Sequence, residues 1–412
     1  MVSLLAAAEE PSAHHPALTT GLALTVSLVQ ALGDTGTGAP LWCLTRGAVS
    51  TGRADRLTRP AQAQVLGLGW TAALEHPERW GGVVDLPDQL DRRAAERLAA
   101  VLTNRTGEDQ LAVRASGVLA RRIVRAASAD PAPARPWSPR GTTLVTGGTG
   151  TLAPHLARWL ARQGAEHIVL TSRRGPAAPG AAELVQELAE LGCEATAVAC
   201  DLTDRDAVAD MLGALKAEGR TVRTVVHTAV TIELAPLAET TLDAFAKVVD
   251  AKVSGARHLD ELLDDDELDA FVLYSSSAGM WGSGAHAAYV AGNAYLNALA
   301  EHRRARGARA TAVSWGIWAD DLKLGRVDPA QIRRSGLVFM DPQLALTGLR
   351  QALDDDETVL AIADVDWERY HPVFTSARPA PSSRTCPRSG GWRTGTPKPR
   401  PRATSSPPGS SN

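Results

Sequence analysis

Three side chains that can hold or transfer a proton occur between residues 271 and 300. Ser276 follows an apolar run that predicts a buried strand, and Tyr289 and Asn293 lie on the Ala-rich helix that comes next. Residues four apart share a helical face, so Tyr289 and Asn293 should point the same way. A tyrosine is a poor acid near neutral pH unless a nearby cation stabilises its phenolate. Taken alone, a tyrosine in such a helix is more often a packing residue.

A candidate for that cation precedes this segment, on the long helix predicted by LDAFAKVVDAKVSGARHLDELL. Lys247 is expected to be solvated. Lys252 lies among small residues, AKVSGA, which would let the helix pack closely on a sheet and turn the ammonium toward Tyr289. A solvated position for Lys252 is the alternative.

A dinucleotide site is predicted by TTLVTGGTGTLAPHLARWLARQG. Residues 142–145 form a short buried strand, residues 147–150 a tight turn, and residues 152–162 a helix with Pro154 in its first turn. Glycines let the backbone approach a pyrophosphate, and the helix N-terminus offers it free N–H groups and partial positive charge. A plain strand-to-helix turn is the alternative, but HIVLTS completes a βαβ unit and favours a cofactor.

The end of the second strand distinguishes between dinucleotides. An NAD site typically has an acidic residue there, whereas this chain has Ser172, Arg173 and Arg174, and a guanidinium suits a 2′-phosphate. NADPH is therefore expected, with a solvated basic turn as the alternative. The third strand ends at Asp201, near the expected adenine, and the strand TVRTVVHTAV ends beside the expected nicotinamide.

The composition narrows the class of protein. The 412 residues are enough for two domains, and 44% apolar with 22% charged residues is typical of a globular protein. A formal charge of −3 and scattered basic residues argue against nucleic acid or a membrane surface as partners, and no apolar run is long enough for a membrane span. The four cysteines lack metal-site or disulfide spacing, so we expect no metal and a reducing, cytoplasmic location.

Strand and helix patterns alternate along the chain, which predicts an α/β fold with parallel sheets. The first part has no phosphate-binding glycine loop, and it begins with VSLLA as if inside a strand. A Pro-rich stretch, ASADPAPARPWSPR, then marks a linker before the pattern restarts.

Together these segments resemble one family. TGGTGTL, LTSRRG, CDLTD, VVHTA, AKVSGA, YSSSAG, AYVAGNAYLNALA and VSWGIWA occur in the order and spacing of ketoreductase domains of modular type I polyketide synthases, members of the short-chain dehydrogenase/reductase superfamily. The resemblance runs from about residue 2 to residue 378.

The resemblance implies two Rossmann-like, doubly wound subdomains. Residues 1–130 correspond to a structural, non-catalytic subdomain that is expected to be truncated, lacking the family's opening strands. Residues 131–140 are the linker, and residues 141–378 correspond to the catalytic subdomain. Residues 379–412 are rich in Ser, Pro and Arg and are expected to be disordered, either as a solvated basic tail or as an out-of-frame reading of a GC-rich gene.

The resemblance also implies roles for individual residues. Tyr289 resembles the proton donor and Ser276 the hydroxyl that binds the substrate carbonyl. Lys252 resembles the ammonium that lowers the pKa of the tyrosine, and Asn293 the amide that completes the proton relay. In most of the wider superfamily the lysine stands four residues after the tyrosine, where this chain has Asn293. The residues expected to contact NADPH are Gly147, Gly148, Thr149, Gly150, Thr151, Leu152, Ser172, Arg173, Arg174, Asp201, Leu202, His227, Thr228 and Ala229.

The implied activity is reduction of the β-keto group of an intermediate attached to an acyl carrier protein, alongside other polyketide synthase domains. The LDD triplet of enzymes that give a D-hydroxyl is replaced by Ile232, Glu233 and Leu234, whereas Trp281 stands eight residues before Tyr289, as in enzymes that give the L-hydroxyl. His286 is similar to the histidine that accompanies an L-α-methyl substrate. The resemblance thus implies an A-type, A2-like enzyme; a packing role for Trp281 or His286 is the alternative.

Three departures from the family pattern stand out: Ala153 for the last loop glycine, Val230 for a glycine beside the nicotinamide, and an unusual lid sequence at residues 320–328. None removes a catalytic residue. Two other functions stay open. One is a free-standing alcohol dehydrogenase for small molecules, which the nucleotide-free first half argues against, and the other is a catalytically silent structural module.

Overall fold

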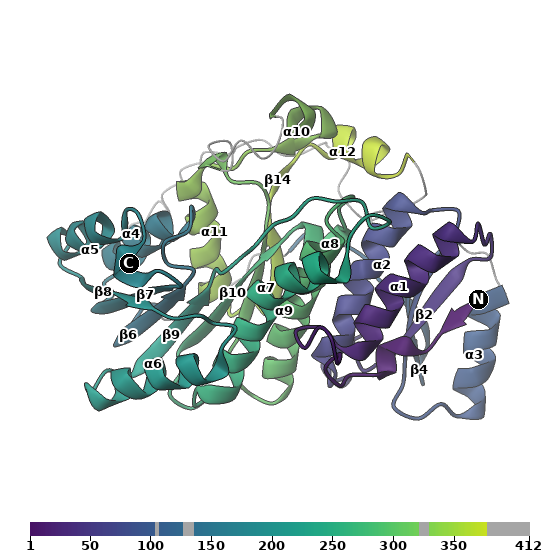
Figure 1. The fold of residues 1–412 in the computed structure, drawn as a ribbon, viewed down its shortest axis with the longest axis horizontal. Coiled ribbons are helices and arrows are strands. Elements are labelled where there is room, and N and C mark those ends of the chain that lie inside the picture. The colour runs from purple at the N-terminus through teal and green to yellow at the C-terminus, as the bar shows by residue number, and fades with distance from the viewer. Residues whose placement is uncertain (104–106, 127–135, 321–328, 377–412) are drawn as a thin grey trace, which may run out of the picture.

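Two parallel-sheet regions lie side by side in the computed structural model, which describes residues 1–103, 107–126, 136–320 and 329–376 (Figure 1). The expected α/β fold with two Rossmann-like regions is confirmed. Residues 131–135 of the expected linker, the tail from residue 379 and residues 321–328 of the expected lid lie outside the described residues.

The first region is a five-stranded sheet in the order β1-β2-β3-β4-β5. Its strands are β1 (Val2–Ser3), β2 (Leu41–Arg46), β3 (Trp80–Leu86), β4 (Gln110–Arg114) and β5 (Gly117–Ala120), and its helices are α1 (Thr20–Asp34), α2 (Ala63–Glu75) and α3 (Arg92–Thr103). Two details differ from expectation. The opening strand is limited to β1, because residues 5–7 form a 3₁₀ turn. Strands β4 and β5 form a hairpin and are antiparallel, whereas the alternating pattern predicts parallel strands.

The second region is a seven-stranded parallel sheet in the order β13-β11-β10-β9-β6-β7-β8. Its strands are β6 (Thr142–Thr146), β7 (His167–Ser172), β8 (Glu194–Ala199), β9 (Val222–His227), β10 (Ala270–Ser276), β11 (Thr311–Trp315) and β13 (Val359–Ile362). Its helices are α4 (Ala153–Arg162), α5 (Ala181–Glu190), α6 (Arg205–Ala217), α7 (Leu242–Leu262), α8 (Ala278–Trp281), α9 (Ala287–Ala305) and α11 (Pro342–Asp354).

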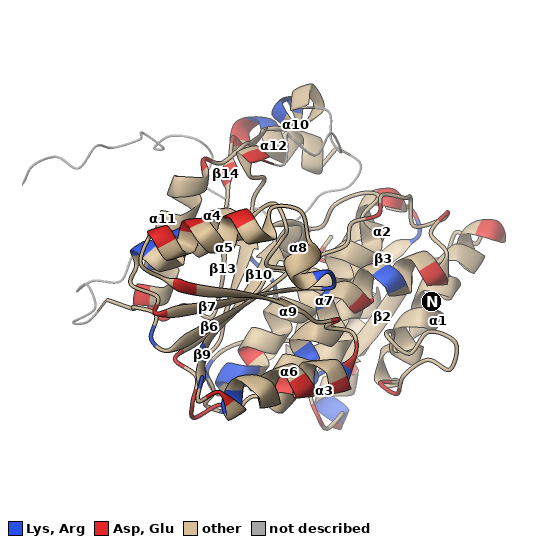
Figure 2. Ribbon diagram, turned by 60° about the vertical axis from the view of Figure 1, so that its left-hand side comes forward, with Lys and Arg blue, Asp and Glu red and all other residues tan. Residues whose placement is uncertain are grey.

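The two strands β12 (Leu337–Val338) and β14 (Asp364–Val365) pair with each other, and the nearby helices α10 (Pro329–Ser335) and α12 (Trp367–Phe374) pack together above the seven-stranded sheet (Figure 1). Charged residues are concentrated on the helices and loops, whereas the strands of the seven-stranded sheet have few of them (Figure 2). Parallel sheets covered on both faces favour such apolar strands. None of the described helices is long and apolar enough to cross a membrane.

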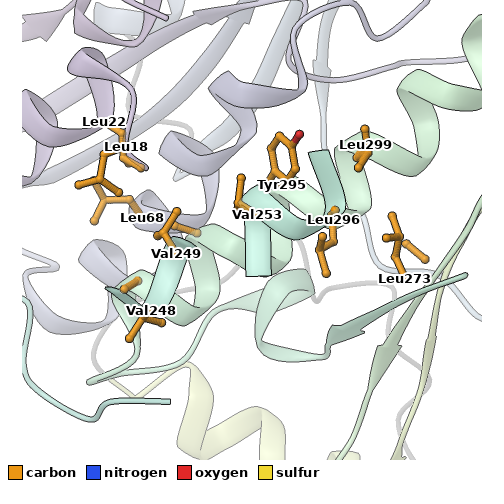
Figure 3. Close-up of a cluster of buried hydrophobic side chains, with 14 of the residues drawn as sticks. Leu18, Leu22, Leu68, Val248, Val249, Val253, Leu273, Tyr295, Leu296 and Leu299 are labelled. Atoms are coloured by element: carbon orange, nitrogen blue, oxygen red, sulfur yellow. The ribbon is translucent and has the colours of Figure 1, made fainter. Parts of the chain in front are cut away.

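A large apolar cluster joins the two regions. Helix α9 packs on β10 and β11 and, on its other side, on α2 of the first region. Gly67 makes this approach close, because a Cβ there would lie 2.7 Å from the carbonyl oxygen of Val290. Figure 3 shows the resulting cluster, in which side chains of the first region meet those of α7, α9 and β10: Leu18, Leu22, Leu68, Val248, Val249, Val253, Leu273, Tyr295, Leu296 and Leu299. The helix with Tyr289 is therefore buried between the two regions.

Candidate active site

The strand order of the seven-stranded sheet reverses between β6 and β9. From β6 the sheet grows through β7 and β8 on one side and through β9, β10, β11 and β13 on the other. At such a reversal the loops after the two central strands diverge, and the crevice at the carboxyl ends of the strands is where α/β folds bind ligands. The loop that begins at Gly147 follows β6, and Thr228 and Ala229 follow β9, so these predicted residues lie on either side of the reversal.

The glycine loop fits tightly over the end of β6. Gly147 has a φ of +68°, and a Cβ on it would lie 2.9 Å from the Cα of Ala229. The N–H of Gly148 donates to the carbonyl of Thr171 (2.9 Å), and a Cβ on Gly148 would lie 2.8 Å from the Cα of Leu170. These two glycines therefore place the loop between β7 and β9.

The remainder of the loop leads into α4. Thr149 and Leu152 are half-buried, while Gly150 and Thr151 are exposed to solvent. Helix α4 begins at Ala153 with Pro154 in its first turn, as expected. The exposed part of the loop and the N–H groups at the start of α4 offer the environment that a pyrophosphate prefers.

Two exposed guanidinium groups follow β7. Arg173 and Arg174 are exposed, and neither forms an ion pair with a side chain in the described parts of the chain. Ser172 shapes the turn that presents them, because its hydroxyl accepts a hydrogen bond from the N–H of Gly175 (3.0 Å). Two exposed guanidinium groups without a carboxylate partner among the described residues fit a 2′-phosphate.

The end of β8 is a polar turn. The Oδ1 atom of Asp201 accepts hydrogen bonds from the N–H and the hydroxyl of Thr203, at 3.0 and 2.8 Å, and the residue is exposed. Leu202 is buried, where it packs close to Gly255 of α7. The small-residue stretch AKVSGA thus brings α7 against the ends of the strands, in agreement with the sequence pattern.

His227 is fully buried and its ring is used within the protein. Its Nε2–H donates to the carbonyl of Lys252 (2.9 Å), because a carbonyl can only accept, and Nδ1 then accepts from the hydroxyl of Thr146 (2.8 Å). Burial lowers the pKa of His227 to about 3, so the ring is neutral. The imidazole ties β6, β9 and α7 together, and a contact of His227 to a cofactor would have to use its backbone.

Lys252 and Tyr289 come together although they belong to different helices. The Nζ atom of Lys252 lies 5.7 Å from the centre of the Tyr289 ring and donates a hydrogen bond to the carbonyl of Tyr274 (2.9 Å). Lys252 is only 3% exposed, and this burial lowers its pKa to about 7. Tyr289 itself is half-buried, so it lies between the buried lysine and the solvent side of the crevice.

Asn293 lies one turn beyond Tyr289 on α9. Its Nδ2 donates to the backbone carbonyl of Tyr289 (2.8 Å), while its Oδ1 is buried and accepts no hydrogen bond from any described residue. A buried acceptor without a partner is costly, which marks Oδ1 as a position for a water molecule or a ligand group. The backbone carbonyl of Asn293 is bonded instead by the hydroxyl of Ser275 (3.2 Å).

Ser276 ends β10 and is half-buried at the same edge of the sheet. Its hydroxyl oxygen accepts a hydrogen bond from the N–H of Ala278 (3.2 Å), so the hydroxyl hydrogen is left to donate elsewhere. Because β10 packs against α9, Ser276 lies on the strand next to the helix that carries Tyr289 and Asn293.

The two residues expected to control stereochemistry have different surroundings. Trp281 is 6% exposed and meets Trp367 and Tyr370 of α12 edge-on, with ring centres 5.8 and 6.1 Å apart. The His286 ring lies 6.2 Å from that of Tyr289, and burial lowers its pKa. Trp281 thus connects α8 with α12, whereas His286 is next to the candidate catalytic tyrosine.

Some residues that shape the site carry no signal in the sequence. Tyr274 acts through its backbone carbonyl, a group that every residue has. Thr146 acts through its hydroxyl, and nothing in the sequence distinguishes it from the other threonines on strands. Glu75 bonds two loops of the second region from α2, across 162 and 210 positions of sequence. No group of His, Cys, Asp and Glu side chains within the described ranges is arranged to hold a metal ion.

Comparison with known proteins identifies the family of this chain. The family model of the KR domain matches residues 141–320, and a model of the Rossmann fold domain of the polyketide synthase extender module SpnB matches residues 1–123. Among solved structures, one of A-type ketoreductases from a modular polyketide synthase has a TM-score of 0.88 at 50% identity, and the alignment covers 93% of this chain and 81% of the other. The chain belongs to the ketoreductase domains of modular polyketide synthases.

Other relatives of this ketoreductase domain point the same way. A C2-type ketoreductase from a modular polyketide synthase has a TM-score of 0.86 at 47% identity and covers 94% of this chain and 83% of its own. The polyketide synthase GfsA of Streptomyces halstedii is 53% identical over 92% of this chain. The pikromycin polyketide synthase component PikAIII of Streptomyces venezuelae is 51% identical over 86% of this chain. The chain spans 5% and 23% of the length of these two relatives.

Proposed function

We propose that this domain is an NADPH-dependent β-ketoacyl reductase. The observation that carries the proposal is the position of the Lys252 amine, 5.7 Å from the Tyr289 ring, at the same sheet edge as the glycine loop after β6. A phenol next to a buried amine can act as a general acid, and a strand-order reversal with a glycine loop can hold a dinucleotide.

The residues around the crevice fit NADPH. Residues 147–152 and the start of α4 would hold the pyrophosphate, Ser172, Arg173 and Arg174 the 2′-phosphate, and Asp201 and Leu202 the adenine end. The backbone from His227 to Ala229 would lie beside the nicotinamide. When bound, NADPH supplies the hydride that reduces the carbonyl carbon.

The chain's own residues manage the proton and the charge on the carbonyl oxygen. Tyr289 donates its phenolic hydrogen to that oxygen, and the Ser276 hydroxyl donates a hydrogen bond to it. Both interactions strengthen as negative charge develops, so they favour the transition state over the bound ketone. Lys252 in its charged form stabilises the phenolate left on Tyr289, and the unpartnered Oδ1 of Asn293 can hold a water molecule through which the proton is replaced.

The proposed substrate is a β-ketoacyl chain attached to an acyl carrier protein, and the proposed product is the L-hydroxyl, with an L-α-methyl group on the substrate. Trp281 and His286 support this assignment, since a bulky indole near α12 and an imidazole beside Tyr289 would restrict the side from which the chain enters. The acyl carrier protein and neighbouring synthase domains are the proposed partners.

The test is NADPH oxidation with a β-ketoacyl thioester by the wild type and by Tyr289→Phe. Removing the phenolic hydrogen should lower kcat by about 10²- to 10⁴-fold without changing NADPH affinity. Tyr295→Phe is the matched control, because Tyr295 lies on the same helix but is buried in the core between the two regions, and it should retain full activity.

The outcome separates the alternatives. Equal inertness of the wild type and Tyr289→Phe, with NADPH still bound, would favour a silent structural module. Reduction of small free ketones in preference to the thioester would favour an alcohol dehydrogenase. A chiral separation of the thioester product tests the L-configuration, and a D-hydroxyl product would contradict it.

A further inference from the structure

The carboxylate of Glu75 reaches from the first region into the second. Glu75 is the last residue of α2, and its two oxygens accept backbone N–H groups from two separate loops. The N–H of Ala285 donates to Oε1 and that of Leu237 to Oε2, both at 2.6 Å. Charge-assisted bonds of this length are among the stronger hydrogen bonds in proteins. One carboxylate thus accepts hydrogen bonds from two loops of the region that holds the candidate site.

The loop at Ala285 is in a conformation that needs support. Ala285 has a φ of +58°, which is unfavourable for a residue with a Cβ. Its N–H is bonded by Glu75, and its carbonyl accepts from the N–H of Ala235 at 3.1 Å. The next residue is His286, and α9 then begins two residues before Tyr289. The direction in which α9 starts therefore depends on the left-handed turn that Glu75 bonds.

The loop at Leu237 is held from the first region in the same way. The Nε2 group of Gln30 on α1 donates to the carbonyls of Leu237 and Thr240, at 2.9 and 2.8 Å. Thr241 directly afterwards caps α7, the helix that carries Lys252, by accepting from the N–H of Ala244 (3.2 Å). The two loops that lead into the helices of Lys252 and Tyr289 are thus both bonded by helices of the first region.

A further hydrogen bond joins α2 to the loop before α9. The hydroxyl of Thr71, one turn before Glu75 on α2, donates to the carbonyl of Ser283 at 3.1 Å. Helix α2 packs along α9, so these polar contacts continue an apolar interface rather than standing alone (Figure 1).

We infer that Glu75 is a positioning residue for ketone reduction: its carboxylate joins the loops at Ala285 and Leu237 and so sets how Tyr289 and His286 face the substrate. This inference rests on the proposed function. It assigns a task in the reaction to the first region, which would otherwise only support the fold. A small displacement of a catalytic group can cost about 10²-fold in rate, so a side chain that fixes a loop can matter without touching the substrate.

The test compares Glu75→Gln with Glu78→Gln. Glutamine keeps the length of the side chain but places an NH₂ group against one of the two N–H donors, so one loop loses its bond. Glu78 lies three residues further on, is largely exposed and pairs with Arg79, which makes it a matched control. Hydrogen exchange in peptides covering residues 235–240 and 282–288 is measured first, because it reports the loops without requiring turnover.

We expect Glu75→Gln to exchange faster in at least one of these peptides, to lose about tenfold or more in kcat, and to give a less pure product configuration. Its NADPH affinity should stay within about twofold of the wild type, since the cofactor loop is elsewhere. Thr71→Val, which removes only the bond to Ser283, should have a smaller effect in the same direction and decides the matter if Glu75→Gln does not fold.

Unchanged exchange, kcat and product configuration in Glu75→Gln would overturn the inference. A loss of kcat that only parallels a loss of NADPH affinity and of thermal stability would also overturn it, because that pattern belongs to a purely structural residue. A wild type that binds NADPH but reduces no β-ketoacyl thioester would contradict the proposed function, and the exchange result would still decide whether Glu75 holds the loops.

Discussion

The two sheets end differently at their carboxyl edges. In the five-stranded sheet, β1 to β4 follow one another in a single direction, so the described strands contain no reversal, whereas the order of the seven-stranded sheet reverses between β6 and β9. A crevice for a ligand forms at a reversal. The carboxyl edge of the five-stranded sheet (the first edge) is closed by side chains instead, in contrast to that of the seven-stranded sheet (the second edge). Asp85 at the end of β3 is fully buried and accepts hydrogen bonds from Thr45 (2.7 Å), from the N–H of Ala48 (2.9 Å) and from Arg114 (2.7 Å).

The charges at these two edges are used in opposite ways. In the first sheet Arg114 is paired with both Asp85 and Asp55. Burial acts to lower the pKa of Arg114, but these pairings together outweigh it and raise the pKa. In the second, no carboxylate among the described residues pairs with Lys252, and burial lowers its pKa. Removing one partner of a buried ion pair leaves an uncompensated charge and destabilises the fold, while a charge without a counterion is available to a reacting group. The charged groups at the first edge therefore hold the fold together, whereas Lys252 at the second edge is left available for chemistry.

The largest expected effect is on catalysis at the second edge. Lys252→Met keeps an unbranched apolar stem but removes the amine, and kcat/KM should fall by about 10²- to 10⁴-fold because the Tyr289 phenolate loses its stabilising charge. Lys247→Met on the same helix is the control, because Lys247 is exposed and pairs with Glu233. Activity of Lys252→Met within about tenfold of the wild type would remove Lys252 from the mechanism.

The same lysine predicts a pH dependence. Burial lowers the pKa of Lys252 from 10.5 to about 7, so the charged form is lost as the pH rises through about 7, and kcat/KM of the wild type should decline there. For stability the sign is the reverse. Between the two pKa values the unfolded chain binds a proton that the folded chain does not, so this residue favours the fold more as the pH rises from about 7 toward 10.5. A rate profile that stays flat from about pH 6 to about pH 9 would contradict the assignment.

The next effect is on stability at the first edge. Asp85→Asn removes a buried charge that Arg114 needs, and the free energy of unfolding should fall by about 3 kcal/mol. NADPH affinity should not change, because the first edge is separate from the glycine loop. Asp88→Asn, at an exposed position shortly after β3, is the control for denaturant unfolding. A loss of NADPH binding by folded Asp85→Asn would break the division between the two edges.

The smallest effect distinguishes the dinucleotides. Arg173→Ala removes one of two exposed guanidinium groups after β7, so the affinity for NADPH should fall by about tenfold while the affinity for NADH stays the same. Arg92→Ala on the exposed side of α3 removes a comparable charge from the first region and should change neither affinity. Equal losses for NADPH and NADH in Arg173→Ala would argue against a 2′-phosphate contact.

Local patterns predicted much of this molecule. The strand, glycine turn and helix between residues 142 and 162 appear as expected, because apolar runs, glycine and a first-turn proline act over a few residues. The approach of Lys252 to Tyr289 was also predicted, from the small residues AKVSGA that bring α7 onto the sheet.

Contacts made through backbone groups could not be predicted. The carbonyls of Tyr274 and Lys252 and the N–H of Ala285 are available in every residue type, so their partners leave no mark on the sequence. The bond from Glu75 also depends on how two regions pack, which is decided by the whole apolar core. The direction of β5 was missed for a similar reason, since a strand pattern is the same in a parallel and an antiparallel pair.

The most direct test is an equilibrium titration of the folded chain with NADPH, comparing the wild type, Arg173→Ala/Arg174→Ala and Asp85→Asn. If only the second edge is a working site, the wild type binds a single NADPH per chain, the double arginine variant binds it much more weakly, and folded Asp85→Asn binds it as the wild type does. Binding of two NADPH per chain, or affinity that follows Asp85 and ignores the two arginines, would contradict the account.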